Sequence, residues 1–383
     1  MSETYQKSSQ IFQDNLKWLL NSEIRIKSGK DKGALFGWKN LNPVSFPFIY
    51  SEIRGYSITC FSWIYSQLSN TNALQAAKGA SEWIIKNLGT YMLVARASGA
   101  DKSDQISNYY YAFDNGMIMI GLLNLYKITR DPNLLELSAN MGKALIERFF
   151  DGSKLTARLD ELYSPIIENK NGGIVKWSTI SGSYHSKLSI GLLELSRLTR
   201  NVKFKQISDS ICDYAIALQK SNGRFVTNGE SNITYLHPHL YSCEGLIYSG
   251  QDQLNANHYS AGLKGIRWAL DQTDRSTTGG LLSHTGTDAV EQSDCTAQLL
   301  RLLILCRNQL KKFLDSSKLD DIINRLHSRL LDFYIPYGKD QGGMRYQLSL
   351  NSACSWCTMF SMQALHLCKI RDSEKPRWIE YFI

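Results

Sequence analysis

The sequence predicts an all-α protein in which six helical hairpins close into one (α/α)6 toroid. Two observations carry this prediction. Apolar helical stretches recur at intervals of roughly 55 to 70 residues, and a regular period of this kind is typical of repeat architectures. Each of the first five stretches is followed by a more amphipathic helical stretch, so the repeating unit is a pair of helices.

The first helix of each pair is apolar nearly all round and rich in Gly, Ser, Ala and Cys. This composition is expected of a helix that is buried on both sides, so these helices are predicted to form an inner ring. They begin near Gly55, Phe113, Tyr184, Pro238, Ser293 and Ser352.

The second helix of each pair carries its charges on one face, which indicates an outer helix exposed to water. Five such helices are predicted, at 72–88, 132–149, 202–219, 254–272 and 316–334. The sixth inner helix has no such partner after residue 370. An amphipathic stretch near the start of the chain, "SQIFQDNLKWLLNSEI", is left over. We therefore expect residues 8–21 to pack beside the helix at 352–368 and to close a single domain that spans residues 1–383.

Short turns that contain glycine precede five of the six inner helices. Glycine followed by β-prone residues is typical of tight turns and short strands. Because the turns recur at one point of the repeat, we expect them on one rim of the ring, together with short β segments. Their sequences are "KGALFGW", "NGGIVKW", "NGRFV", "TGGLL" and "QGGMRY".

Composition excludes several classes of protein. Hydrophobic residues make up 43% of the chain and charged residues 20%, as in ordinary globular proteins. There is no apolar run long enough to span a bilayer and no secretory signal, so a cytoplasmic location is expected. The net charge is +8, but Lys and Arg are dispersed and form no stripe for nucleic acid. The mild positive field suits an anionic saccharide as partner. The oligomeric state stays open.

The eight cysteines do not indicate a disulfide framework or a metal centre. Free cysteine behaves as a small apolar residue. The only close pair is Cys354 and Cys357 in "CSWC", and no second CxxC accompanies it. No metal and no cofactor are predicted.

The first turns of the six inner helices carry side chains capable of chemistry, and the bodies of these helices carry few charges. Some of these residues, such as Asp294, also suit helix caps. A cation near a helix N-terminus is unfavourable, so capping does not explain Arg54. We expect the set to converge on a shared pocket at the mouth of the ring. Its members are Glu52, Arg54, Tyr56, Asp114, Tyr184, His185, His237, His239, Tyr241, Glu244, Asp294 and Trp356.

The ring pattern resembles the six-hairpin glycosidase superfamily over the whole chain. The stretch "PHLYSCEG" resembles the "PHMHLLEA" motif of N-acylglucosamine 2-epimerases. In this alignment His239 matches the first histidine and Glu244 the glutamate, whereas Tyr241 stands where that family has its acid/base histidine. The resemblance implies a carbohydrate-active enzyme, with a reaction other than ordinary 2-epimerisation.

Proton abstraction beside a carboxylate, as in uronate epimerases and lyases, is the first hypothesis. It needs a cation for the carboxylate, a base and an acid. Arg54 is assigned to hold the carboxylate, and Tyr241 and His239 are assigned as base and acid. Glu244 would orient them from about one helical turn away. The alternative for His237 and His239 is that they only bond to the backbone.

Hydrolysis of a glycosidic bond is the second hypothesis, because it needs two opposed carboxyl groups. Asp114, Glu52, Glu244 and Asp294 are sufficient to supply such a pair. Asp114 follows three tyrosines and a phenylalanine in "YYYAFDNG", a setting that would raise its pKa and suit an acid.

A glycan-binding ring without catalysis is the third hypothesis. Under all three hypotheses one set of mouth residues is expected to bind the saccharide: Glu52, Arg54, Tyr56, Tyr184, His185, His237, Asp294 and Trp356.

Overall fold

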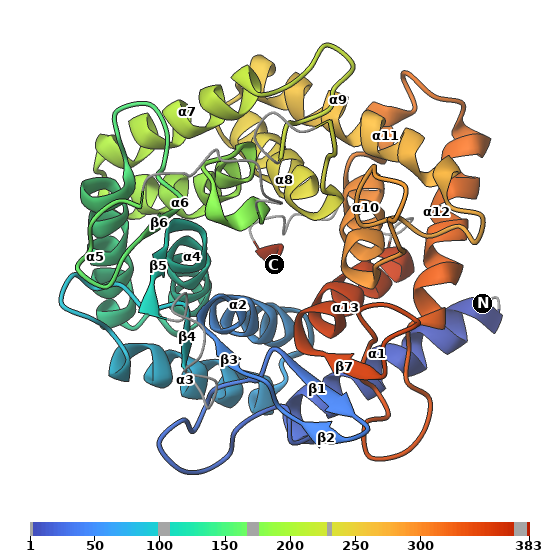
Figure 1. The fold of residues 1–383 in the computed structure, drawn as a ribbon, viewed down its shortest axis with the longest axis horizontal. Coiled ribbons are helices and arrows are strands. Elements are labelled where there is room, and N and C mark those ends of the chain that lie inside the picture. The colour runs from blue at the N-terminus through green and yellow to red at the C-terminus, as the bar shows by residue number, and fades with distance from the viewer. Residues whose placement is uncertain (1–2, 99–107, 167–175, 228–231, 371–380) are drawn as a thin grey trace.

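The computed structural model describes residues 3–98, 108–166, 176–227, 232–370 and 381–383. Its helices form two concentric rings, which confirms the predicted toroid (Figure 1). The inner ring consists of α2 (Ser51–Leu68), α4 (Ala112–Thr129), α6 (Ser189–Thr199), α8 (Leu236–Asp252), α10 (Ser293–Leu305) and α13 (Ser355–Ile370). The outer ring consists of α1 (Glu3–Asn21), α3 (Thr71–Lys86), α5 (Pro132–Phe149), α7 (Val202–Ala217), α9 (Ala256–Asp271) and α12 (Ser316–Asp332).

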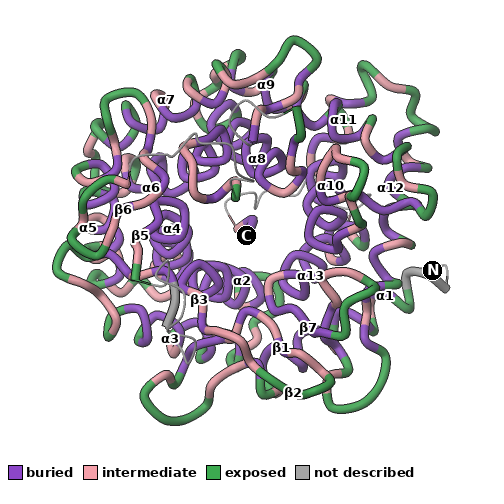
Figure 2. The backbone as a smooth tube through the Cα atoms, viewed as in Figure 1, coloured by how far each residue is buried: buried purple, intermediate pink, exposed green. Residues whose placement is uncertain are grey.

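The burial of the helices follows the sequence pattern from which the two rings were predicted (Figure 2). The inner helix α4 is buried without interruption from Ala112 to Leu125, whereas the outer helices bury one face only. Inner helices also approach each other closely. A Cβ atom at Gly121 would lie 2.7 Å from the carbonyl oxygen of Gly55 on α2, so the contact between α2 and α4 requires glycine there.

Helix α1 closes the ring, as predicted. It packs against α13 and α12, which belong to the C-terminal part of the sequence. Its buried Asn15 donates to the carbonyl oxygen of Gly342 at 2.6 Å, and Ser8 Oγ lies 2.7 Å from Nε2 of His327. Residues more than 300 positions apart therefore form the last hairpin of the toroid.

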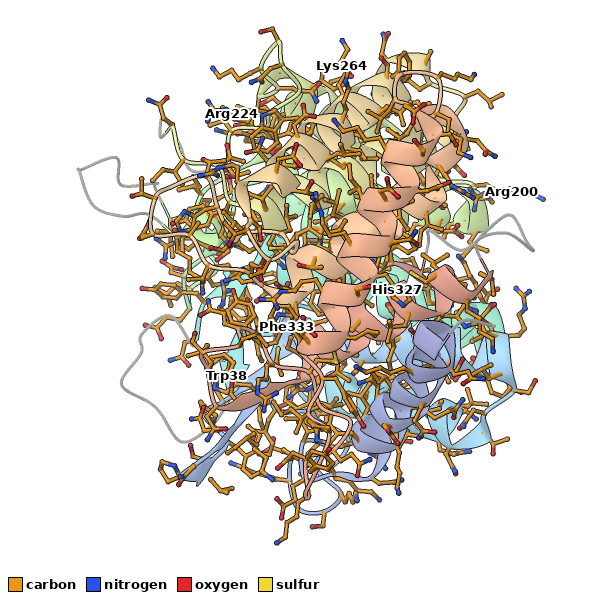
Figure 3. All side chains as sticks on the ribbon, turned by 90° about the vertical axis from the view of Figure 1, so that its right-hand side faces the viewer. Trp38, Arg200, Arg224, Lys264, His327 and Phe333 are labelled. Atoms are coloured by element: carbon orange, nitrogen blue, oxygen red, sulfur yellow. The ribbon has the colours of Figure 1, made fainter. Side chains whose placement is uncertain are left out.

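The first three hairpins share one kind of connection at the end opposite the turns. The inner helix ends at a residue in the left-handed conformation, and an Asn or Asp then caps the outer helix. Ser69 has φ 53° and precedes the cap Asn70. Arg130 and Arg200, each with φ 59°, precede Asp131 and Asn201 in the same way. Figure 3 shows Arg200 at this end of the ring and Trp38 at the other.

The rim near Trp38 carries the predicted glycine turns. Gly33, Gly223, Gly279 and Gly342 have φ between +92° and +98° and pack against α3, α9, α12 and α1 respectively. In "NGGIVKW", residues 171–175 lie outside the described residues. The turn after α5 contains Gly152, with φ +103°, which was not among the predicted turns.

Replacing Gly342 by Ala is expected to destabilise the protein more than replacing Gly338 by Ala. Both have positive φ (+98° and +81°), so each substitution costs about 1–2 kcal/mol of backbone strain. A Cβ at Gly342 would also lie 2.1 Å from the carbonyl oxygen of Asp14 on α1, whereas Gly338 has open space. Overpacking adds about 1–3 kcal/mol. Urea unfolding of both variants measures the difference, and equal losses would contradict this account of ring closure.

Short antiparallel strands stiffen the same rim. β1 (Trp38–Leu41) lies between β2 (Val44–Ser45) and β7 (Ser352–Cys354), and Trp38 pairs with Cys354. Two further pairs join β3 (Ile49–Tyr50) to β4 (Ala97–Ser98) and β5 (Tyr110–Tyr111) to β6 (Arg158–Leu159). These strand pairs place side chains of the loop segments beside the first turns of the inner helices. Among the described residues, no helix has the length and apolarity needed to cross a bilayer.

Residues 381–383 lie inside the ring (Figure 1). Phe382 and Ile383 are fully buried, and the carbonyl oxygen of Tyr381 accepts a bond from Gln363 on α13 at 2.7 Å. The central space between the inner helices is thus filled in part by this segment.

Candidate active site

The side chains at the centre of the ring lie on one stripe of each inner helix. Residues at i, i+4 and i+7 share a helix face, and each turn takes the chain about 5.4 Å deeper into the ring. Three helices present such stripes, and together they produce three layers below the mouth. The stripes are His237, Tyr241 and Glu244 on α8; Asp294, Gln298 and Arg301 on α10; and Trp356, Phe360 and Gln363 on α13.

Asp114 lies in the uppermost layer, in the first turn of α4. It is almost fully buried, and Tyr50 at the end of β3 donates to its Oδ1 at 3.5 Å. Arg96 Nε lies 4.0 Å from Oδ2. Burial raises the pKa of Asp114 to about 7; Arg96 opposes this rise, and the nearby carboxylate of Glu52 adds to it. Asp114 can therefore hold or release a proton near neutral pH.

Arg96 is held rigidly beside this carboxyl group. Its guanidinium lies 3.7 Å from the ring centre of Tyr111 and 4.8 Å from that of Tyr50, and it donates to the Tyr50 hydroxyl. Its Nη1 is buried and has no hydrogen-bond partner among the described residues. Arg96 thus supplies a positively charged donor in the uppermost layer.

Asp294 lies in the same layer on α10. Its Oδ2 accepts a bond from the indole of Trp356 at 3.0 Å and lies 3.7 Å from Nδ1 of His237. Its Oδ1 accepts from the backbone amide of Cys295, at 2.8 Å. The sequence analysis grouped these three side chains, Asp294, Trp356 and His237, and the structure brings them together.

The middle layer contains a chain of hydroxyl groups. The Tyr56 hydroxyl bonds to Glu52 and to the Tyr241 hydroxyl. Burial raises the pKa of both phenols well above the usual value, so both are neutral and donate protons. Tyr241 therefore connects through Tyr56 to the carboxylate of Glu52. In the same layer, the amide of Gln298 is buried and has no partner among the described residues.

The deepest layer is a buried cluster of charges. Glu244 bonds to Lys187, and its Oε1 accepts from Arg301 at 2.8 Å. All three side chains are fully buried, and burial lowers the pKa of Lys187 to about 8. Arg301 also donates to Gln363 and, at 3.1 Å, to the carbonyl oxygen of Ile383. Glu244 therefore neutralises cations and does not orient His239.

Arg54 and His239 do not lie with the other predicted residues. The Arg54 guanidinium stacks on Trp83 of the outer helix α3, at 4.6 Å, and donates to the carbonyl oxygen of Tyr50. His239 accepts from the Phe225 amide and donates to the carbonyl oxygen of Gly265 at 2.9 Å. Both point from the inner ring towards the outer ring, where they support packing. His239 thus bonds to the backbone, as the alternative for this residue proposed.

Tyr184 and His185 belong to η3 (Ser183–Leu188), a 3₁₀ helix that leads into α6. Tyr184 packs on Phe113 and on Trp177 at ring-centre distances of 5.4 and 4.9 Å. His185 is buried against Tyr184, and burial lowers its pKa to about 3. A histidine with this pKa stays neutral at physiological pH.

One cluster in the described residues has the geometry of metal ligands. Atoms of His237, Asp294 and Cys295 lie within 4.8 Å of one another. Burial raises the pKa of the Cys295 thiol well above the usual value.

Sequence reasoning missed several residues of the site. Tyr50 ends the short strand β3 and Arg96 directly precedes β4, so both lie outside the inner helices. Gln298 and Arg301 lie deeper in α10 than the first turn, which was the part considered. The i, i+4, i+7 spacing from Asp294 would have identified Gln298 and Arg301.

Comparison with known proteins identifies the fold. No family profile and no curated protein matches the sequence. Among solved structures, cellobiose 2-epimerase from Spirochaeta thermophila DSM 6192 has a TM-score of 0.73 at 12% identity, over 96% of both chains. The chain shares the toroid of that enzyme. A D-mannose isomerase has a TM-score of 0.70 at 10% identity, over 96% of this chain and 98% of its own. An unsaturated glucuronyl hydrolase specific for heparin has a TM-score of 0.69 at 8% identity, over 97% and 98%.

These similarities extend over nearly the whole length of each chain. They confirm the predicted likeness to six-hairpin glycosidases as a likeness of fold. At such low identities the site itself must be judged on its own residues.

Proposed function

We propose that the protein is a carbohydrate-active enzyme in which Asp114 is the general acid. The observation that carries this proposal is a pair of carboxyl groups at the mouth of the ring. Tyr50 donates to Asp114, and burial together with the nearby carboxylate of Glu52 raises the pKa of Asp114 to about 7. Glycoside hydrolysis requires a carboxylic acid that keeps its proton near neutral pH and a second carboxylate beside it.

The assigned roles follow from the surroundings of each group. Asp114 protonates the leaving oxygen of the sugar, and Glu52, fixed by Tyr56, either activates water or attacks the anomeric carbon. A retaining and an inverting reaction differ in the separation of the two carboxyl groups. The choice between them stays open in the proposal.

The walls around the pair suit a sugar. Tyr50, Trp177 and Trp356 are half-buried aromatic residues near the uppermost layer, and such rings pack on the apolar faces of pyranoses. Arg96 and Gln298 offer buried donors without a complete set of partners. The proposal is also supported by the fold, which the chain has in common with proteins named as sugar epimerases, an isomerase and a glucuronyl hydrolase.

Proton abstraction is the second candidate, and the hydroxyl chain favours it. A proton taken up by Tyr241 would pass, as Tyr241 and Tyr56 hand on their own hydroxyl protons, to Glu52, the carboxylate to which Tyr56 donates. Arg96 would take the role of carboxylate holder that the sequence analysis gave to Arg54. The reaction would then be epimerisation or β-elimination on a uronate.

Incubation with a panel of neutral and acidic oligosaccharides tests both candidates. Hydrolysis gives new reducing ends without new absorbance from C=C bonds. Elimination gives that absorbance, and epimerisation incorporates solvent deuterium. We expect reducing ends alone. Absorbance or deuterium incorporation that is lost in Tyr241→Phe would replace hydrolysis by the second candidate.

The pH dependence of kcat/KM is expected to fall above pH 7. A general acid works in its protonated form, so activity is lost as pH rises through the pKa of Asp114, which is about 7. The fall should be tenfold per pH unit beyond that point. Initial rates between pH 5 and pH 9 measure it. Activity that instead rises through pH 7 would assign Asp114 as a base.

A further inference from the structure

A cavity opens on the rim beside the mouth. It has a volume of about 1000 Å³ and lies between the segment 21–31, which follows α1, and the segment 46–49, which leads into β3. Its size is at the upper end of the range for binding pockets of small molecules. Its lining includes Phe36, Phe46 and Phe48 as well as Arg25, Lys27 and Lys30.

The aromatic wall leads towards the candidate active site. Phe36 and Phe46 pack at a ring-centre distance of 4.6 Å, and Phe48 lies 5.9 Å from Tyr50. Tyr50 donates to Asp114. A second branch runs from Phe48 to Trp38 at 4.8 Å and from Trp38 to Trp356 at 5.8 Å. All of these rings are half-buried and so keep part of their surface exposed.

The cavity carries uncompensated positive charge. Arg25 and Lys27 donate to backbone carbonyl oxygens, of Leu20 and Asn21, which carry no net charge. The three cations of the lining outnumber its two acids: Glu23 pairs with Lys39 at 3.0 Å, and Asp31 accepts from the neutral indole of Trp83 at 3.1 Å and keeps its charge. The field of the cavity therefore favours an anionic ligand.

We propose that this cavity binds the further sugars of an acidic oligosaccharide whose reacting unit lies at Asp114. The inference rests on the proposed function and names its substrate class. Aromatic faces accept the pyranose rings, while Lys27, Lys30 and Arg25 attract the carboxylate or sulfate groups. Phe48 lines the cavity and packs on Tyr50, which indicates that one saccharide chain occupies both places. A single monosaccharide would use only the part at Asp114.

Direct binding tests the inference without turnover. The protein with Asp114→Asn is titrated by calorimetry with acidic disaccharides and hexasaccharides: oligogalacturonates, oligoguluronates and heparin fragments. Cello-oligosaccharides of both lengths are the neutral probes. We expect at least one acidic hexasaccharide to bind about tenfold more tightly than its disaccharide and than the neutral hexasaccharide. Added salt should weaken this binding.

Two substitutions in the cavity should remove the tighter binding of the hexasaccharide relative to the disaccharide. Phe46→Ala and Lys30→Glu are each expected to lower hexasaccharide affinity about tenfold and to leave disaccharide affinity unchanged. Lys32→Glu is the matched control, since Lys32 is an exposed lysine of the same segment that does not line the cavity. Equal affinity for both lengths, equal loss in the control, or no binding of any acidic probe would overturn the inference.

The test separates this inference from the proposed function. Tight, length-dependent binding together with a wild-type protein that leaves these oligosaccharides unchanged would refute the enzyme and keep the binding site. Turnover of short and long substrates with equal kcat/KM, unaffected by Phe46→Ala, would keep the enzyme and refute the cavity.

Discussion

Replacing Asp114 by Asn is expected to lower kcat/KM by about 10²–10⁴-fold, the usual effect of losing one acid/base group. The amide matches the carboxyl group in shape and still accepts a bond from Tyr50, but it cannot deliver a proton. Because Asp114 is buried and its pKa is about 7, much of it is already neutral at pH 7. The variant should therefore fold normally, and its circular dichroism and melting curve should match those of the wild type. Loss of the fall in activity above pH 7 is the specific sign of its role.

Tyr241→Phe is the control for this experiment. It removes a hydroxyl that is bonded to Tyr56 and keeps the ring that packs on Phe113. Under hydrolysis its effect should stay within about tenfold, because Tyr241 would only support Tyr56 and Glu52. The opposite order, with Tyr241→Phe the more severe loss, would favour proton abstraction through the hydroxyl chain. That order is the one expected from the sequence alone, where Tyr241 occupied the place of a catalytic histidine.

The ring was predictable because the sequence repeats one physical pattern six times. Helices without a polar face must be buried on both sides, and the amphipathic helix at residues 8–21 had no partner other than the last inner helix. The glycine turns were also predictable. Gly33, Gly223, Gly279 and Gly342 share one left-handed conformation because each packs closely against an outer helix.

The site was only partly predictable, because residues of one helical turn point in different directions. His237 and Tyr241 are four apart and face the centre of the ring. His239, between them, is rotated by about 200° from each and faces the outer helix α9. Arg54 stands in the same relation to Glu52 and Tyr56, and so stacks on Trp83. The sequence analysis selected first-turn residues by chemical type and ignored the rotation of about 100° per residue. It therefore grouped side chains that face the centre of the ring with side chains that face the outer helices.

Long-range partners were beyond sequence reasoning altogether. Glu244 bonds to Lys187 and Arg301, each 57 positions away, because η3, α8 and α10 converge at one depth. Arg96 reaches Asp114 only because the pairing of β3 with β4 brings the segment before the second inner helix to the mouth. No local sequence pattern indicates either of these contacts.

Replacing Glu244 by Gln is expected to lower the free energy of unfolding by about 3–5 kcal/mol at pH 7, the usual cost of breaking a buried ion pair. Glu244 is the carboxylate bonded to both Lys187 and Arg301, and all three side chains are fully buried. The amide keeps the volume and loses the charge, so two cations remain close together without an anion from this residue. Urea unfolding measures the loss. The exposed pair of Lys205 and Asp209, at 2.9 Å, gives the matched control, since Asp209→Asn should cost less than about 1 kcal/mol.

The pH dependence of this deficit identifies its cause. Lys187 can lose its proton, and burial already lowers its pKa to about 8, whereas Arg301 stays charged. Without Glu244 the folded-state pKa of Lys187 should fall further below its unfolded value of about 10.4. The unfolded state then binds the extra proton between the two values, so the stability of Glu244→Gln should rise with pH across that window. Lys187→Met in the same background should recover part of the loss at pH 7, because it removes one unpaired charge and keeps an apolar stem. A deficit below about 1 kcal/mol that does not change with pH would show that the three charges do not form a coupled cluster beneath the site.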